Sequence, residues 1–216
     1  SFFNAFARTL EGLVGMVCRV SPEQSDDVPK PMTEHWEDID KEGNHGDVFL
    51  KTVFADAMEA GHCAILVDYP TVADPETLTK ADERNLDLRP YWIHVRKDDI
   101  MNFRTARAPG GRRILEQITL RLRTHEADGA FGDKAVVRYR VYQRVKGTVI
   151  WETWQEGEDR VPRPIGERGV IRKQEQIPIV PIYGRQAGFF ESTPPLLDLA
   201  NLNILHYQTN ADYLHA

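Results

Sequence analysis

The first stretch of the chain carries apolar side chains at spacings of three and four residues, which places them on one face of a helix. Three prolines, Pro22, Pro29 and Pro31, follow with serine and aspartate between them. Proline lacks a backbone N–H, so we expect an irregular linker there. The apolar series predicts a helix over residues 1–18, and its members are Phe2, Phe3, Phe6, Leu10, Leu13, Val14 and Val17.

A second helical series follows an acidic run at 34–42 and a turn at Gly43. Apolar residues recur at helical spacing from Val48 to Met58. Gly61 then stands at a position where a glycine commonly ends a helix, so we expect it to be the C-cap.

Two short apolar runs predict strands. Residues 62–68 follow the helix cap and are too few for another helix, so we expect a buried strand. Residues 91–95 alternate around Trp92 and His94 and predict a second strand. Between the two, residues 71–88 are polar and lack a clear period, which predicts a loop or a loose helix.

From residue 112 to residue 154 the period of the apolar positions changes to two, as in strands with one buried face. Turn pairs at 128–129 and 146–147 divide this segment, which predicts an antiparallel meander of about three strands. Residues 157–169, rich in proline, arginine and glutamate, predict a long turn or a mobile loop. The outer face of the meander is expected to be basic, with Arg121, Arg123, Arg138, Arg140 and Arg144.

The last part of the chain predicts an edge segment and a long helix. Pro178 and Pro181 remove two donors from residues 177–183, which limits them to an edge strand or an extended connector. Thr193 followed by two prolines is a typical helix start. Behind it, apolar residues step by three and four, and these are Leu197, Ala200, Ile204, Tyr207, Ala211 and Leu214.

Together these elements predict an α+β fold: a small, mostly antiparallel sheet with flanking helices and a long C-terminal helix. We expect a helix and proline-bearing linker at 1–33, an α+β body at 34–192, and the start of a long helix at 193–216. The chain begins and stops inside helical patterns, so we expect more protein on both sides. No apolar run approaches the roughly eighteen residues that span a bilayer, so we expect no membrane partner.

Charge is distributed unevenly along the chain. The net charge of -6 argues against a dedicated nucleic-acid binder. Residues 21–99 carry 8 basic and 19 acidic residues, a net of -11, whereas residues 100–146 carry 11 basic and 4 acidic residues, a net of +7. Solvated surfaces and an electrostatic interface between subunits both explain this contrast. For an interface, the candidate residues are Arg121, Arg123, Arg138 and Arg140.

The residue types of common catalytic sites are present without their usual spacing. The phosphate-binding pattern G-x-x-x-x-G-K-[ST] does not occur, which argues against a packaging ATPase. Cys18 and Cys63 lack a second pair, so neither a disulfide framework nor a zinc ribbon is indicated. Cys63 lies in an apolar run and is expected to be an inert thiol. We therefore expect a non-enzyme without catalytic residues, cofactor or metal.

Two alternatives stay open. His35 lies among acidic residues but lacks the second histidine of an H-E-x-x-H helix. Asp68, Asp98 and Asp99 are residue types that a two-metal nuclease uses, although no lysine stands at the short spacing many nucleases have.

A series of motifs extends over nearly the whole chain: Phe2-Phe3-Asn4-Ala5, Ala7-Arg8-Thr9, Gly12-Leu13-Val14-Gly15, Gly61, Ala64-Ile65-Leu66-Val67-Asp68-Tyr69-Pro70, Arg89-Pro90-Tyr91, Asp99-Ile100, Pro194-Pro195-Leu196-Leu197-Asp198-Leu199-Ala200, Asn203, His206-Tyr207-Gln208 and Ala211-Asp212. In this order they resemble a phage and prophage family labelled as a domain of unknown function. The members of that family are similar to tailed-phage portal proteins.

The resemblance implies a structural role as a portal, or head-tail connector, subunit. Such subunits form a homo-oligomeric ring, usually a dodecamer, at the capsid vertex for DNA packaging and ejection. The implied partners are the packaging terminase, the capsid, head-completion or tail proteins, and double-stranded DNA in transient, sequence-independent contact. The implied locations are the virion and, during assembly, the host cytoplasm.

The resemblance covers the wing-like body of a portal, because the stem, clip and crown are not recognisable in the sequence. Another virion or head-assembly protein is the first alternative. A metal-dependent nuclease of prophage origin is the second.

Overall fold

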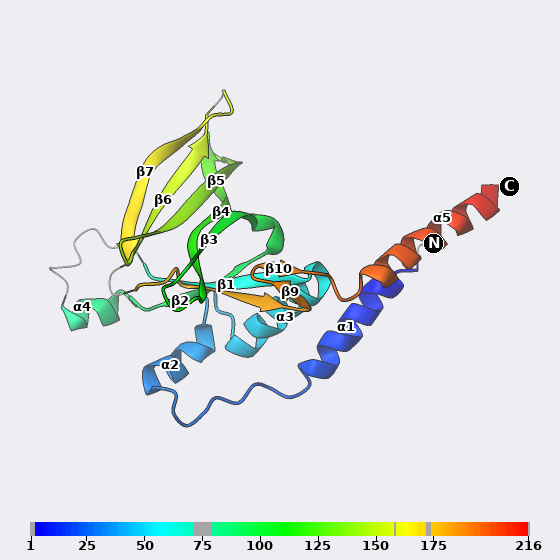
Figure 1. Cartoon of the computed structure of the whole chain (residues 1–216), viewed down its shortest axis with the longest axis horizontal. Coiled ribbons are helices and arrows are strands. Elements are labelled where there is room, and N and C mark those ends of the chain that lie inside the picture. Colours follow the sequence, from blue (N-terminus) through cyan, green and yellow to red (C-terminus); the bar gives the residue numbers. More distant parts are fainter. Residues whose placement is uncertain (1–2, 71–78, 158, 172–173, 216) are drawn as a thin grey trace. The chain divides into compact units, whose positions relative to one another are not determined.

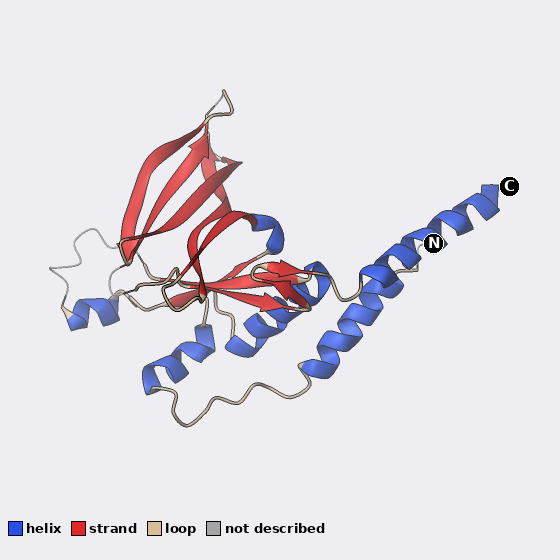
Figure 2. Cartoon of the chain, viewed as in Figure 1, coloured by secondary structure: helices blue, strands red, loops and turns tan. Residues whose placement is uncertain are grey.

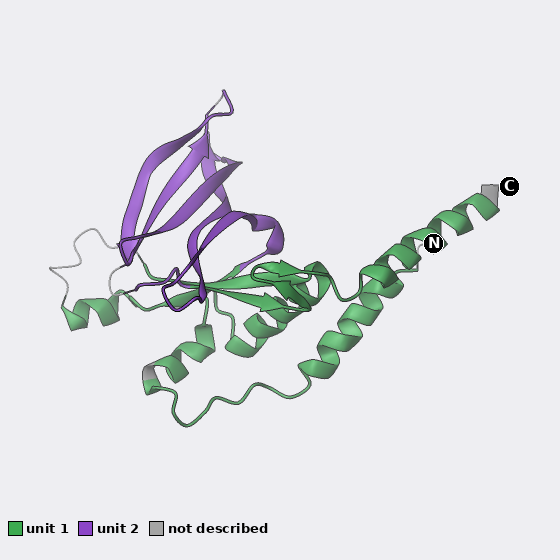
Figure 3. Ribbon diagram, in the orientation of Figure 1, with its two compact units in different colours: residues 1–94, 179–216 green, residues 95–178 purple. Residues whose placement is uncertain are grey.

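The computed structural model describes residues 3–70, 79–157, 159–171 and 174–215 and divides into two compact units (Figure 3). Unit 1 is built from two stretches that lie far apart in the sequence, residues 1–94 and 179–216. Unit 2 is residues 95–178. The segment expected as a single body, 34–192, is therefore shared between the two units.

Unit 1 combines helices with a three-stranded sheet in the order β2-β1-β8 (Figures 1 and 2). This architecture confirms the α+β class. A two-stranded antiparallel ribbon, β9–β10, precedes the last helix. The elements are α1 (Ala5–Val17), α2 (Lys30–His35), α3 (Gly46–Ala60), β1 (His62–Asp68), α4 (Lys80–Asn85), β2 (Tyr91–Val95), β8 (Ile179–Tyr183), β9 (Gln186–Gly188), β10 (Glu191–Ser192) and α5 (Leu197–His215).

The core of unit 1 forms where α3 packs on β1. Phe49, Val53 and Ala57 lie on one face of α3 at four-residue spacing, and they pack with Cys63 and Ile65 of β1. The helical stripe and the buried strand predicted at these positions are both confirmed. Aromatic rings of Trp36 and Trp92 pack against this cluster, with their centroids 6.1 Å apart in an edge-to-face arrangement.

Gly61 ends α3 and turns the chain into β1. It has φ 94° and ψ -35°, a left-handed backbone conformation that favours glycine. Its N–H donates to the Ala57 carbonyl, and its own carbonyl accepts the Gly184 N–H, both at 2.9 Å. A Cβ at this position would lie 2.9 Å from the backbone nitrogen of Pro194. The expected C-cap is confirmed, and Gly61 additionally permits a close approach to the segment before α5.

The segment with two prolines forms the expected edge strand. β8 pairs antiparallel with β1, with Pro181 opposite Ala64, and it has an outer position in the sheet. An edge strand tolerates proline because its outer side needs no donor. Residues 179–183 thus complete a sheet that residues 62–68 begin.

The two terminal helices of unit 1 contact each other. The Ala5 N–H at the start of α1 donates to Asn203 Oδ1 of α5 at 2.9 Å, and Asn203 is buried. α1 and α5 confirm the helices predicted at the two ends, although residues 1 and 2 of the first lie outside the described residues. No helix in the described part of the chain is long and apolar enough to cross a membrane.

Two polar segments that were expected to be irregular or loosely helical contain short helices. The proline-bearing linker contains α2, which begins at Lys30 with Pro31 in its first turn, where a missing N–H costs no helical hydrogen bond. Within the segment 71–88, residues 80–85 form α4 with a capping box at Thr79. Residues 71–78 of that expected loop lie outside the described residues.

Unit 2 contains a five-stranded antiparallel sheet in sequential order, β3-β4-β5-β6-β7. The antiparallel meander of about three strands predicted between residues 112 and 154 is confirmed as β4, β5 and β6, and β3 and β7 extend the sheet on either side. Buried side chains of this unit include Ile118, Leu120, Tyr142, Val149 and Thr153. The strands are β3 (Ile100–Arg107), β4 (Arg113–Asp128), β5 (Gly132–Val145), β6 (Thr148–Glu156) and β7 (Pro162–Ile171).

The two strands that the sequence did not predict are the two edges of this sheet. β7 occupies much of the segment expected to be a long turn, and most of its residues are exposed. Its Pro162 and Pro164 are tolerated because only one side of the strand pairs. β3 at the other edge is half exposed and has no fully buried residue. An exposed edge strand lacks the regular apolar alternation on which the prediction relied.

Replacing Gly61 by alanine should lower the free energy of unfolding by about 2 kcal/mol or more. The backbone conformation costs about 1 kcal/mol for a residue with a side chain, and the close approach to Pro194 adds to it. Gly43→Ala is the matched control, because Gly43 has φ 85° but no atom within 4 Å of an added Cβ. Urea unfolding of both variants measures the difference, and equal losses would contradict a packing role for Gly61.

Candidate functional site

The sheet register separates the arginines that were expected to share one face. Tyr139 of β5 stands directly opposite Arg121 of β4, so the two side chains point to the same side. Arg138 and Arg140 are the neighbours of Tyr139 along β5 and therefore point to the other side, whereas Arg123 shares the side of Arg121. The expected single basic face is wrong, because a period of two does not determine which face of one strand matches which face of the next.

Arg121 and Arg123 share one carboxylate within unit 2. Arg121 Nε donates to Asp99 Oδ1 at 3.0 Å, and its Nη2 donates to the Asp98 carbonyl at 2.8 Å. Arg123 Nη2 donates to the same Asp99 oxygen at 3.3 Å. The Asp99 side chain is only 18% exposed, whereas that of Arg123 is 59% exposed. Arg121 therefore ties the 3-10 turn at 97–99 to β4, and Arg123 retains most of its contact with solvent.

The arginines on the opposite face contact neighbouring strands. Arg138 forms ion pairs with Glu126 of β4 and, at 3.7 Å, with Glu167 of β7. The Arg140 guanidinium lies 4.6 Å from the ring centroid of Trp151 on β6, a cation–π contact. These contacts compensate positive charge inside the sheet and connect its strands.

A different basic cluster lies at the β3–β4 turn. Arg107 stands directly opposite Arg113, and Arg112 adjoins the turn, where its carbonyl accepts the Ala108 N–H. All three side chains are exposed, and the described residues provide none of them with an ion-pair partner. Like charges in directly paired positions are unfavourable in a sheet. The sequence signal for this cluster is the Arg112-Arg113 doublet that follows two glycines.

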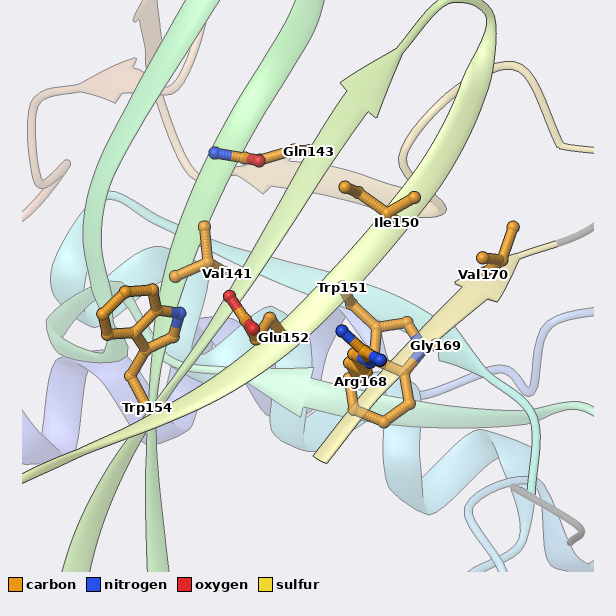
Figure 4. A pocket seen from close by; sticks show the side chains of 9 residues that line it. All are labelled: Val141, Gln143, Ile150, Trp151, Glu152, Trp154, Arg168, Gly169 and Val170. Carbon is orange, nitrogen blue, oxygen red and sulfur yellow. The ribbon is translucent and has the colours of Figure 1, made fainter. Parts of the chain in front are cut away.

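An open cavity of about 540 Å³ lies on the face that carries Arg121, over β5, β6 and β7 (Figure 4). Glu152 and Arg168 occupy opposite register positions within it, next to the indole of Trp154. This mixture of apolar, aromatic and charged side chains suits contact with a protein segment. The lining residues are Val141, Gln143, Ile150, Trp151, Glu152, Trp154, Arg168, Gly169 and Val170.

Tyr139 lies on the same face as this cavity. Burial raises the pKa of its hydroxyl, and the Glu156 carboxylate acts in the same direction. The protonated hydroxyl donates to Glu156 Oε1 at 3.2 Å. Tyr139 is thus a hydrogen-bond donor between β5 and β6 at neutral pH.

The aspartates and histidine considered for metal chemistry have local structural roles. Asp99 holds the two arginines described above. Asp68 accepts the Tyr69 N–H at 2.9 Å and the Tyr91 hydroxyl at 3.3 Å. His35 is the last residue of α2. The contacts of Asp68 and Asp99 give these two residues roles in the fold that require no metal.

Helix α5 exposes apolar side chains on two of its faces. Leu202, Leu205 and Tyr213 lie along one face and are 61%, 58% and 81% exposed. Ile204 and Tyr207 of the predicted apolar stripe lie on another face and are exposed as well. α1 covers only part of the helix, through the contact with Asn203. Apolar surface of this kind commonly marks a protein–protein contact.

No protein-family model matches the chain, and no curated protein shows significant similarity to it.

Replacing Arg121 by methionine should lower the free energy of unfolding by about 1 to 2 kcal/mol, because two hydrogen bonds to the turn at 97–99 are lost, one of them to the Asp99 carboxylate, which is only 18% exposed. Arg123→Met is the matched control and should change stability by less than about 0.5 kcal/mol, because its single contact is exposed. Chemical denaturation monitored by tryptophan fluorescence measures both. A loss at Arg123 as large as at Arg121 would contradict the different roles.

Proposed function

We propose that this chain is the body of a portal subunit of a tailed phage or prophage, and that it assembles into a ring through which DNA passes. The proposal assigns a structural rather than a catalytic role. The observation that carries it is the exposed apolar surface of α5, which a subunit of a larger assembly would bury against its neighbour. The second copy of the chain is the proposed occupant of this surface.

The order of the elements supports the proposal. A helix and a linker lead to α3, which ends at Gly61 and continues as the buried strand β1. A small antiparallel sheet follows, then the edge strand β8 with Pro181, and then the long helix α5. The motifs that resemble the portal-like family lie in these same elements, at the Gly61 cap, in β1 and along α5.

Charge complementarity supports a ring in particular. A ring closes through heterologous contacts, in which one face of a subunit meets a different face of the next. The basic turn with Arg107, Arg112 and Arg113 offers one such face, and the acidic stretch 21–99, with its net charge of -11, offers the other. Arg121, Arg123, Arg138 and Arg140 remain candidate interface residues, and Arg123 is the most accessible of them.

DNA is a transient partner in this proposal. A channel must let the duplex slide, so its subunits should bind phosphates weakly and without sequence preference. A chain with a net charge of -6 is suited to such a role, because its net charge repels the polyanion.

Replacing both Leu202 and Leu205 by glutamate should weaken self-association of the chain at least tenfold, because charge then occupies the apolar surface of α5. Asn201→Glu is the matched control: Asn201 is an exposed polar residue of the same helix, so the variant adds charge without removing apolar area. Sedimentation equilibrium measures association. A wild-type chain that stays monomeric at its highest attainable concentration would contradict the proposal.

Replacing both Arg112 and Arg113 by glutamate should also weaken self-association and reduce its dependence on salt, because an attractive contact becomes repulsive. Lys134→Glu changes the charge of an exposed residue in the same sheet, away from this turn, and should have little effect. Measurements at low and high salt separate this effect from loss of folding. Unchanged association of the double variant would exclude the turn from the subunit contact.

A further inference from the structure

Three side chains of unit 1 that carry metal-binding atoms lie close together, one from α3, one from β1 and one from β2. Asp56, Cys63 and His94 place a carboxylate oxygen, a thiol sulfur and an imidazole nitrogen within 4.8 Å of one another. Cys63 is fully buried, and the side chains of Asp56 and His94 are 10% and 18% exposed. Groups with this burial are partly shielded from water but remain accessible from the His94 side.

The three residues meet because the core brings together three elements. Asp56 precedes Ala57 on α3, Cys63 is the second residue of β1, and His94 lies near the end of β2, the neighbour of β1 in the sheet. Phe49 packs edge-on against the His94 ring, with centroids 6.5 Å apart. The cluster is therefore held by packing and not by a flexible loop.

The distances are close to those of a tetrahedral zinc site. Zinc–ligand bonds of about 2.0 to 2.3 Å place neighbouring ligand atoms about 3.4 to 3.6 Å apart. Asp56 Oδ2 and His94 Nε2 are 3.0 Å apart, and the widest separation in the cluster is at most 4.8 Å. An inward movement of the sulfur by about 1 Å, within the reach of a χ1 adjustment, would bring all three atoms to bonding distance.

We propose that Asp56, Cys63 and His94 bind one Zn²⁺ ion, with a water molecule as the fourth ligand. A thiolate together with an imidazole favours zinc over magnesium or calcium, which prefer oxygen ligands. A carboxylate and a thiolate together balance the two positive charges of the ion. A neutral complex is the form that a largely buried site stabilises best.

Binding exchanges protons for the metal. The Cys63 thiol now donates to the Val53 carbonyl at 3.2 Å. Burial, followed by the charge of Asp56, raises the pKa of this thiol to about 12, so it is inert in the free protein, as expected from the sequence. A bound Zn²⁺ ion lowers the pKa of this thiol again. Its positive charge offsets the charge of Asp56, and its bond to the sulfur compensates for the lost hydration. The thiol proton leaves to solvent as the S–Zn bond forms. His94 Nε2 donates to Asp56 Oδ2 in the free protein, so the imidazole ring changes tautomer: the proton leaves Nε2, another binds Nδ1, and the freed Nε2 lone pair binds the ion. The net release is one proton per ion.

The ion would connect α3, β1 and β2, the three elements that form the core of unit 1. Ligand binding to the folded state alone raises its stability. This role is independent of ring assembly, so the zinc site and the portal proposal stand or fall separately.

Cobalt titration of the metal-free chain tests the site, because Co²⁺ reports its ligands by absorption. We expect a one-to-one complex with visible d–d bands and a thiolate-to-cobalt charge-transfer band, both lost when Zn²⁺ displaces the cobalt. Zn²⁺ should also raise the melting temperature. Release of one proton per ion, followed with a pH indicator, measures the exchange at the Cys63 thiol.

The two cysteines provide a matched pair of variants. Cys63→Ser should abolish the charge-transfer band, whereas Cys18→Ser, outside the cluster, should retain it. Asp56→Asn and His94→Gln should each weaken binding more than tenfold while the thiolate band survives at saturating metal, so the test does not depend on the folding of Cys63→Ser. Absence of the band in the wild-type chain, or its persistence in Cys63→Ser, would overturn the proposal.

Discussion

The close approach at Gly61 is the constraint on which unit 1 depends. Two stretches of chain that are far apart in the sequence form this unit, and they meet where α3 turns into β1. There the Gly61 carbonyl accepts the Gly184 N–H, and the backbone before α5 passes at a distance that leaves no room for a side chain. The pairing of β1 with β8 continues the same contact. The position of α5 therefore follows from one glycine and one edge strand.

In unit 2 the comparable constraint is the strand register. Most of the expected interface arginines have partners within unit 2: Asp99 for Arg121 and Arg123, and Glu126 with Glu167 for Arg138. In these ion pairs the positive charges hold neighbouring segments together, so less positive charge is available to bind another molecule. The Arg112 and Arg113 side chains are exposed and have no ion-pair partner among the described residues, so they leave uncompensated positive charge at one end of the β3–β4 hairpin.

The sequence predicted well those elements whose apolar pattern reports burial on one side. α3 and β1 are examples, since Phe49, Val53 and Ala57 repeat at the helical period and the strand run is short and bounded by glycine and proline. The spacing of its apolar residues also predicted α5, although Ile204 and Tyr207 of that series are exposed. It failed at β3 and β7, because exposed edge strands carry little apolar pattern, and at the arginine face, because register depends on hydrogen-bond pairing between strands. The Asp56–Cys63–His94 cluster was equally beyond prediction, since its members come from three elements that meet only in the fold.

These features together describe a protein that uses its polar residues to connect strands and helices and exposes apolar surface on α5. In the proposed function, a second copy of the chain covers this apolar surface. Electron microscopy of the protein purified from cells that express its natural gene tests this account most directly. The account predicts rings with a central channel, and a monomer that cleaves DNA when magnesium or manganese is added would contradict it.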